Sequence, residues 1–351
     1  MNPGGWNLLG GSMAPISIYF GRTTVNEESA YFPARDEFID WLVAESPSVP
    51  KVREVLYTCR SMHGVDLFSL MRRDYDPNVF YGGRPFQVAM FVAVAYFFEE
   101  LFRPTIASVG FYSAGVSSSY VFSDVFSLAT YFEKVVPFQV QVRRAMEETG
   151  ERFPLREVMI EGEAGDEIES YVATIIRRHK LFDRIFLKDR RRPNAVHLAG
   201  YADDLAAVRD MIWKQFPGSG KSGGTLHPAI GAHVPLYDRR PIDSILDSVA
   251  FNPPRFPLVT IRGERLSRGS DDQDLLRRHY ADANQGPMDS GAAFDALAGA
   301  GREIVVVGTP FGAKVLRRLE LAPYPVPRLA AEIMLERRGA RCRSEVARSR
   351  E

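Results

Sequence analysis

Two short segments far apart in the sequence carry the residue types of a serine nucleophile and its base. Ser113 lies in the segment 109–115, where small residues follow an apolar run, and His233 begins the segment 233–236. A serine hydroxyl is a poor nucleophile near neutral pH, so it needs a sharp turn, an imidazole within hydrogen-bond reach and backbone N–H groups directed at the oxyanion. The two segments together predict nucleophilic catalysis through Ser113, with the Ala114 N–H as one oxyanion donor.

Each of these residues also has an ordinary structural interpretation. Ser113 falls where a strand is expected to end and a helix to begin, so its hydroxyl could simply cap that helix. His233 follows Gly231 and Ala232 and precedes a proline, a pattern typical of a loop, where a histidine is a better candidate base than inside an element. His227 is close in the sequence and is a rival for the same role.

The elements that must position these residues alternate between strands and helices. Apolar runs indicate the strands, and apolar positions at helical spacing indicate the helices. The expected strands are 16–20, 105–110, 157–160, 195–200, 257–261 and 303–307, and the expected helices include 49–62, 86–101, 113–126, 167–179, 202–216, 241–249 and 272–280. This alternation predicts an α/β fold with a mainly parallel sheet covered by helices on both faces.

Between about residues 150 and 215 the predicted order becomes strand, helix, strand, helix, which indicates an inserted small subdomain. We expect a flexible N-terminus at 1–15, a main core formed by 16–149 and 216–335, a small αβ insert at 150–215, and a flexible tail at 336–351. A glycine-rich stretch at 218–222 is similar to part of a phosphate-binding loop. The first glycine of that motif is Gln215 here, so we interpret the stretch as a linker.

Composition narrows the classes of protein that the chain can be. Its 351 residues are 45% hydrophobic and 25% charged, which is typical of a globular protein. With 44 basic and 44 acidic residues, no net charge favours nucleic acid or a membrane surface. Cys59 and Cys342 are not in a metal-ligand spacing, and the longest apolar run, 88–98, is too short to span a bilayer. We therefore expect a cytoplasmic protein without a metal.

Further short segments, in a fixed order along the chain, point to a known family. Segment 111–115 is similar to a Gly-His-Ser-x-Gly elbow, and 233–236 to a His-Ser-Pro-Leu loop. The other similar segments are 18–22, 87–91, 251–259 and 307–312. Through these segments the chain resembles the malonyl-CoA:acyl-carrier-protein transacylase family, the acyltransferases of fatty-acid and polyketide synthesis.

The resemblance implies a fold and a reaction. The fold is an α/β-hydrolase-like core that carries Ser113 and His233, with a ferredoxin-like subdomain at 150–215. In the implied ping-pong reaction, Ser113 takes an acyl group from a CoA or phosphopantetheine thioester and passes it to an acyl carrier protein, with no bound cofactor. The backbone N–H groups of Arg22 and Ala114 would stabilise the oxyanion.

The resemblance also assigns roles to residues around Ser113 and His233, the catalytic dyad that it implies. Gln87 and Tyr112 correspond to substrate-binding positions, and Tyr112 replaces the histidine of the family's elbow. A backbone carbonyl from the segment around Asn284 or Gln285 would orient His233. The basic run that includes Arg190, Arg191 and Arg192 is the expected docking surface for an acidic carrier protein.

Departures from the family pattern bear on the acyl group. In ungapped register, Phe138 occupies the place of the arginine that holds the malonyl carboxylate, and the small Gly231 and Ala232 precede His233. These residues predict a roomy apolar pocket for an uncharged acyl group larger than malonyl, because an unpaired buried carboxylate is costly. Arg22, or Arg143 or Arg144 after a register shift, would instead permit an acidic substrate.

Two other functions are left open by the sequence. Water could attack the same acyl-enzyme, which would make the protein an acyl-carrier-protein thioesterase. The altered residues Arg22, Tyr112 and Phe138 also permit a non-catalytic module that binds carrier proteins.

Overall fold

The structure is a computed structural model that describes most of the chain. The described residues are 15–20, 40, 43–44, 46–72, 80–161, 165–191, 195–219, 227–228, 231–300, 303–307 and 324–325. The chain divides into two compact units. Unit 1 consists of 1–111, 117–123 and 297–351, and unit 2 of 112–116 and 124–296.

Unit 1 is built on parallel strands. β1 (Ile16–Phe20), β2 (Ile106–Phe111), β9 (Glu303–Val307) and β10 (Tyr324–Pro325) pair in the order β10-β9-β1-β2. Every residue of β1 is buried, as expected for an inner strand of a parallel sheet. The other elements of this unit are η1 (Ser46–Ser48), α2 (Pro50–His63), α3 (Leu67–Arg72), α4 (Phe80–Phe102) and most of α5 (Val116–Phe122).

Close packing fixes the end of β2, the strand that leads to Ser113. A Cβ atom added at Gly110 would lie 2.7 Å from Leu297 Cδ1, so a larger residue there would require the Leu297 side chain to move. The hydroxyl groups of Ser17 on β1 and Ser108 on β2 share a buried hydrogen bond of 2.9 Å. The segment before Ser113 is therefore held by both its backbone pairing and its side chains.

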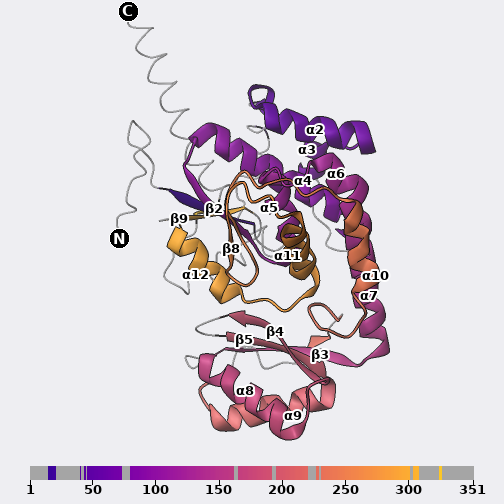
Figure 1. Cartoon of the computed structure of the whole chain (residues 1–351), viewed down its shortest axis with the longest axis vertical. Helices are drawn as coiled ribbons and strands as arrows, with labels where there is room; N and C mark the ends of the chain where they lie inside the picture. The colour runs from indigo at the N-terminus through magenta and orange to yellow at the C-terminus, as the bar shows by residue number, and fades with distance from the viewer. Residues whose placement is uncertain are drawn as a thin grey trace, which may run out of the picture. The chain divides into compact units, whose positions relative to one another are not determined.

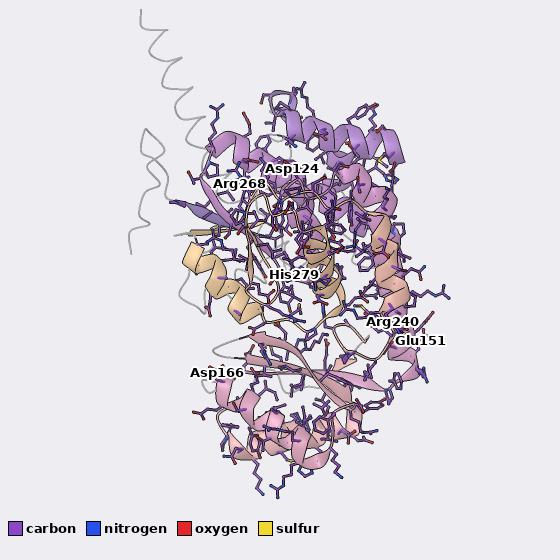
Figure 2. All side chains as sticks on the ribbon, in the orientation of Figure 1. Asp124, Glu151, Asp166, Arg240, Arg268 and His279 are labelled. Atoms are coloured by element: carbon purple, nitrogen blue, oxygen red, sulfur yellow. The ribbon has the colours of Figure 1, made fainter. Side chains whose placement is uncertain are left out.

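Unit 2 contains a second, antiparallel sheet. β3 (Leu155–Glu161), β4 (Ile185–Arg191), β5 (Ala195–Tyr201) and β6 (His227–Pro228) pair in the order β4-β5-β3-β6. α8 (Gly165–His179) follows β3 and α9 (Ala202–Gln215) follows β5, and both helices lie on the same face of the sheet (Figure 1). Asp166, labelled in Figure 2, is in the first turn of α8, where a carboxylate stabilises the helix dipole.

The two faces of this sheet have different partners. The face covered by α8 and α9 is aliphatic and includes Val158, Val196 and Leu198, which pack against residues such as Leu205 and Ile212. The opposite face has a smaller apolar cluster. Its members are Leu155, Phe186, Ala199 and Val234, with Phe153, Tyr201 and Leu236 packed against them.

The other elements of unit 2 carry the candidate site and its surroundings. They are η2 (Ser113–Gly115), α6 (Leu128–Thr130), η3 (Tyr131–Val135), α7 (Val136–Arg152), α10 (Arg240–Asp243), η4 (Ser244–Ser248), β7 (Leu258–Val259), β8 (Arg265–Leu266), α11 (Gln273–Gln285) and the larger part of α12 (Ser290–Ala300). Asp272 caps α11, because its side chain accepts a 2.8 Å hydrogen bond from the Leu275 N–H.

The predicted α/β fold class is confirmed, and the structure adds elements that the sequence did not indicate. β4 and α12 were not predicted, and the helix expected to reach residue 126 ends at Phe122. The predicted domain boundaries stay predictions. Apart from residue 15, the predicted flexible termini lie outside the described residues.

Candidate active site

Ser113 and His233 lie side by side in unit 2. Ser113 Oγ is 3.1 Å from His233 Nε2, and His233 Nδ1 is 2.8 Å from the carbonyl oxygen of Gly286. His233 is buried, whereas Ser113 is half-buried. The three residues form a continuous chain of hydrogen bonds from a hydroxyl to an imidazole to a backbone carbonyl.

This chain fixes the tautomer of a neutral His233. A carbonyl oxygen only accepts hydrogen bonds, so Nδ1 carries the proton and donates it to Gly286. The lone pair of a neutral imidazole is then on Nε2 and faces the Ser113 hydroxyl, which donates to it. This is the arrangement that a general base requires before it removes the proton of a serine nucleophile.

Both members of the pair have a left-handed backbone. The φ angle is 47° at Ser113 and 59° at His233. Non-glycine residues avoid this region, and each such residue costs about 1–3 kcal/mol unless its surroundings hold it. At Ser113 the strained residue begins η2, where the Gly115 N–H donates to the Tyr112 carbonyl oxygen at 2.9 Å. Such a strained turn directs the serine side chain out of the backbone, as in a nucleophile elbow.

The loop of His233 is packed on both sides. Val234 and Leu236 pack on the sheet face opposite to α8 and α9. On the other side, a Cβ atom added at Gly231 would lie 2.8 Å from the Cβ and Cγ2 atoms of Thr149 in α7, and the φ angle there is 50°. In the direction of that Cβ atom, Gly231 therefore leaves no room for an acyl group, because α7 occupies the space. Ala232 is half-buried.

Tyr112, which precedes Ser113, is directed at β4. Its hydroxyl donates a 3.1 Å hydrogen bond to Asp189 Oδ2, and the residue is only 6% exposed. Tyr112 was predicted to bind substrate, and this hydroxyl is already engaged by a protein carboxylate. Asp189 was not singled out by the sequence, because it lies inside a charged run.

The carbonyl that orients His233 comes from a residue later than predicted. It belongs to Gly286, not to Asn284 or Gln285. The side chains of the two predicted residues have other partners: Asn284 Nδ2 donates to the Tyr280 carbonyl, and Gln285 Nε2 donates to Asp243 Oδ1 at 2.6 Å. α11 ends at Gln285, and Gly286, which caps it, has the carbonyl that points at the imidazole.

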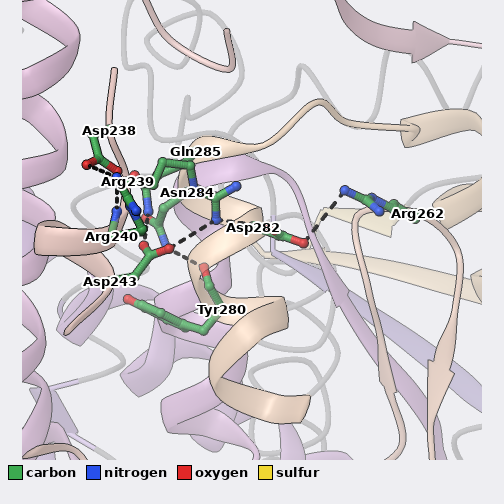
Figure 3. A network of polar contacts seen from close by, with 9 residues as sticks. All are labelled: Asp238, Arg239, Arg240, Asp243, Arg262, Tyr280, Asp282, Asn284 and Gln285. Carbon is green, nitrogen blue, oxygen red and sulfur yellow. Dashed lines mark hydrogen bonds and ion pairs between the residues drawn. The ribbon is translucent and has the colours of Figure 1, made fainter. Parts of the chain in front are cut away.

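An ionic network surrounds this helix end (Figure 3). Arg239, from the loop of His233, donates to Asp282 on α11 at 2.8 Å and lies 3.6 Å from Asp243. Arg262 lies 3.6 Å from the same Asp282 carboxylate. Burial raises the pKa of Asp243, and the hydrogen bond from Gln285 and the charge of Arg239 offset part of that rise. The network joins the loop that contains His233 to α11, the helix that precedes Gly286.

Phe138 is a core residue. It is fully buried on α7, with its ring centroid 5.9 Å from that of Tyr280. Phe126 and Phe251 complete the aromatic cluster around Tyr280. No part of Phe138 is exposed for the substrate contact predicted for it.

The arginines proposed as alternative clamps have acidic partners on their own helix. Arg143 bonds Glu147 at 2.6 Å, and Arg144 bonds Glu148 at 2.7 Å. Both pairs follow the helical spacing of α7, and the Arg144 side chain is 70% exposed whereas that of Arg143 is 21% exposed.

The remaining predicted residues belong to several different elements. Gln87 is buried on α4 in unit 1, and His227 lies in β6, opposite Glu157. Arg190 lies 2.7 Å from Glu169 and 3.8 Å from Asp289 with its side chain 41% exposed, and its role in docking stays a prediction. Arg191 is the last residue of β4. Arg22 and Arg192 lie outside the described residues, and the backbone of Ala114 is part of η2.

Comparison with known proteins identifies the fold. No protein-family model and no curated protein sequence matches the chain. A malonyl CoA-acyl carrier protein transacylase from Coxiella burnetii superposes with a TM-score of 0.68 at 14% identity, over 93% of this chain and 99% of that one. The chain has the fold of these transacylases.

Other solved structures give the same result. An acyl carrier protein S-malonyltransferase from Vibrio cholerae has a TM-score of 0.65 at 14% identity and covers 88% of this chain and 96% of its own. The acyltransferase domain from the second module of the salinomycin polyketide synthase has a TM-score of 0.62 at 17% identity, over 90% of this chain and 69% of that one. The structures similar to this chain therefore include both a malonyltransferase and an acyltransferase domain of a polyketide synthase.

Within the described ranges, no helix has the length and apolarity needed to cross a membrane. In the same part of the chain, no three His, Cys, Asp or Glu side chains come together as a candidate metal site.

Proposed function

We propose that this protein is an acyltransferase that moves an acyl group from a CoA or carrier-protein thioester, through an acyl-enzyme on Ser113, to an acyl carrier protein in fatty-acid or polyketide biosynthesis. The observation that carries the proposal is the Ser113–His233–Gly286 hydrogen-bond chain within an acyltransferase fold. The cytoplasmic location and the lack of a bound cofactor stay predictions.

The proposed reaction has two halves. His233 Nε2 removes the Ser113 proton as Oγ attacks the thioester carbonyl, and the backbone N–H of Ala114 stabilises the oxyanion. The C–S bond then breaks and His233 gives the proton to the departing thiolate. The acyl group remains on Ser113 as an ester. In the second half, His233 deprotonates the phosphopantetheine thiol of the carrier protein, the thiolate attacks the ester, and Ser113 recovers its proton.

We propose an uncharged acyl group as the preferred substrate. The support comes from α7: Phe138 is buried in the aromatic cluster, while Arg143 and Arg144 bond Glu147 and Glu148. A malonyl carboxylate would be costly to bury without a cationic partner. Gly231 does not add to this support, because Thr149 lies where a side chain of residue 231 would begin.

The test is the intact-protein mass after mixing with a panel of acyl-CoAs that includes malonyl-CoA. We expect a mass gain for an uncharged acyl group in the wild type and none in Ser113→Ala. Ser118→Ala is the matched control, because Ser118 Oγ is buried without a hydrogen-bond partner among the described residues. Mass gain in Ser113→Ala would contradict the nucleophile, and preferential loading of malonyl would contradict the proposed substrate.

The fate of the acyl-enzyme separates transfer from hydrolysis. An acyltransferase keeps its acyl group in water and loses it when the phosphopantetheine form of a carrier protein is added. Rapid loss in water alone would identify a thioesterase. If neither acyl-CoAs nor acylated carrier proteins load Ser113, the protein is a binding module.

A further inference from the structure

The residue before the nucleophile and the segment after Gly286 share one buried acceptor. Asp189 on β4 is fully buried. Its Oδ2 accepts from the Tyr112 hydroxyl at 3.1 Å, and its Oδ1 accepts from the Ser290 N–H at 3.1 Å and from Ser290 Oγ at 2.9 Å. One carboxylate therefore bonds both the residue before Ser113 and the segment that follows Gly286.

A β-bulge in β4 directs the Asp189 side chain toward Tyr112 and Ser290. Leu187 pairs with Leu198 on β5, and the register then shifts so that Asp189 pairs with the next residue, His197. The shift interrupts the regular alternation of side chains between the two faces of the sheet. Leu187 packs on the face covered by α8 and α9, and regular alternation would place Asp189 there as well. Bulges commonly redirect a side chain beside a functional site.

Backbone bonds hold the second partner of Asp189 against the same strand. The Met288 N–H donates to the Lys188 carbonyl at 3.0 Å, and the Arg190 N–H donates to the Met288 carbonyl at 3.1 Å. Asp189 and Met288 thus form a parallel bridge. The segment that begins at Gly286 is therefore fixed to β4 directly after the carbonyl that orients His233.

We propose that Asp189 is the positioning residue of the dyad. Through Tyr112 it holds the strained turn of Ser113, and through Ser290 it holds the segment that presents the Gly286 carbonyl to His233. Both Ser113 and His233 have left-handed backbones, which persist only where the surroundings hold them. The proposal rests on the proposed function, since positioning matters for a reaction at Ser113.

The kinetic test uses the rate of Ser113 acylation by acyl-CoA in Tyr112→Phe, with Tyr57→Phe as the control because Tyr57 is 74% exposed. We expect Tyr112→Phe to lower the maximal rate by about tenfold to a hundredfold, since small displacements of a nucleophile have effects of this size. The half-saturating acyl-CoA concentration should change by less than about twofold, because binding is not altered. A wild-type maximal rate in folded Tyr112→Phe would overturn the proposal.

Conservative replacement separates positioning from simple loss of structure. In Asp189→Asn the amide oxygen still accepts from the Ser290 N–H, and the amide nitrogen can donate to the Tyr112 hydroxyl oxygen. We expect Asp189→Asn to keep more activity than Asp189→Ala, and Tyr112→Phe to cause no further loss in the Asp189→Ala background. Equal activity of Asp189→Asn and Asp189→Ala, or fully additive losses, would contradict a shared acceptor.

A readout independent of catalysis distinguishes this proposal from the proposed function. The Nδ1–H proton of His233 should give a downfield proton NMR signal, assigned by its absence in His233→Asn. We expect this signal to shift or broaden in Ser290→Ala and in Asp189→Ala. If it responds but no acyl group ever loads, the proposed function fails and the positioning role stands. If it is unchanged in both variants, the positioning role fails whatever the activity.

Discussion

The two faces of the β4-β5-β3-β6 sheet show how the same strands serve packing on one side and the candidate site on the other. The face covered by α8 and α9 is a continuous aliphatic cluster. The opposite face carries the Val234 contact of the His233 loop, together with Glu157, which forms an ion pair with Lys188 and lies 3.7 Å from His197. Successive side chains of a strand point to opposite faces, so the same strand can pack against α8 and α9 and also contact the His233 loop. The bulge at Asp189 places one more polar group on the face of the His233 loop.

The largest expected effect comes from His233, whose loop packs through Val234 on the face opposite to α8 and α9. His233→Asn removes the base and should lower the rate of Ser113 acylation by about 10⁴-fold or more, while the protein stays folded. The rate of acyl-enzyme formation is the measurement. His279 on α11 (Figure 2) is the matched control, because it pairs with Glu264 at 3.4 Å and His279→Asn should leave the rate unchanged. Equal losses in both variants would remove the distinction between the two histidines.

The aliphatic face should affect stability and not chemistry. Leu198 is fully buried against α8 and α9, so Leu198→Ala should lower the free energy of unfolding by about 2–5 kcal/mol. Val140→Ala, at a position that is 56% exposed on α7, should cost little. Denaturant unfolding measures the change, and the acylation rate of the folded fraction should match the wild type. A slowed rate in folded Leu198→Ala would show that the faces are not separate.

Gly231 tests whether close packing by α7 sets the His233 loop. Gly231→Ala adds both a strained φ angle and a 2.8 Å contact with Thr149, whereas Gly269→Ala adds only strain, since no atom lies within 4 Å there. We expect Gly269→Ala to cost about 1 kcal/mol and Gly231→Ala to cost more and to slow acylation. Thermal unfolding and acylation rates compare the two. Similar costs would mean that Thr149 moves aside freely.

The smallest expected effect is a pH dependence at Asp243. Its pKa is raised above 3.8 by burial, so the folded protein keeps this proton where the unfolded chain has lost it. The contribution of Asp243 to stability therefore falls as pH rises through that window and increases as pH falls. The stability of the wild type relative to Asp243→Asn should increase on acidification, measured by unfolding at a series of pH values. A difference that does not vary with pH would contradict the raised pKa.

The sequence was informative where the signal is local. The strand at Ile16–Phe20 and the strand before Ser113 follow from apolar runs, and α8 and α9 follow from helical periodicity. Ser113 and His233 were proposed from the residues beside them, and the structure places them in contact. Their catalytic roles stay a proposal.

What the sequence did not indicate depends on contacts between distant residues. β4 was overlooked because Lys188, Asp189 and the arginines after them mask its alternation, and partners elsewhere in the fold bury or bind those charges. The packing of Gly231 against Thr149 could not be read from small residues alone. The choice of Gly286 over Gln285 depends on where α11 ends, and helix ends are the least certain part of a sequence-based prediction.

The most direct test of the central claim is to locate the acyl group. Wild-type protein is incubated with the acyl-CoA that loads best, digested with a protease, and analysed by fragmentation mass spectrometry. The account predicts an acyl ester on Ser113, absent in Ser113→Ala and formed far more slowly in His233→Asn. An acyl group on any other residue, or one that forms at the wild-type rate without His233, would contradict it.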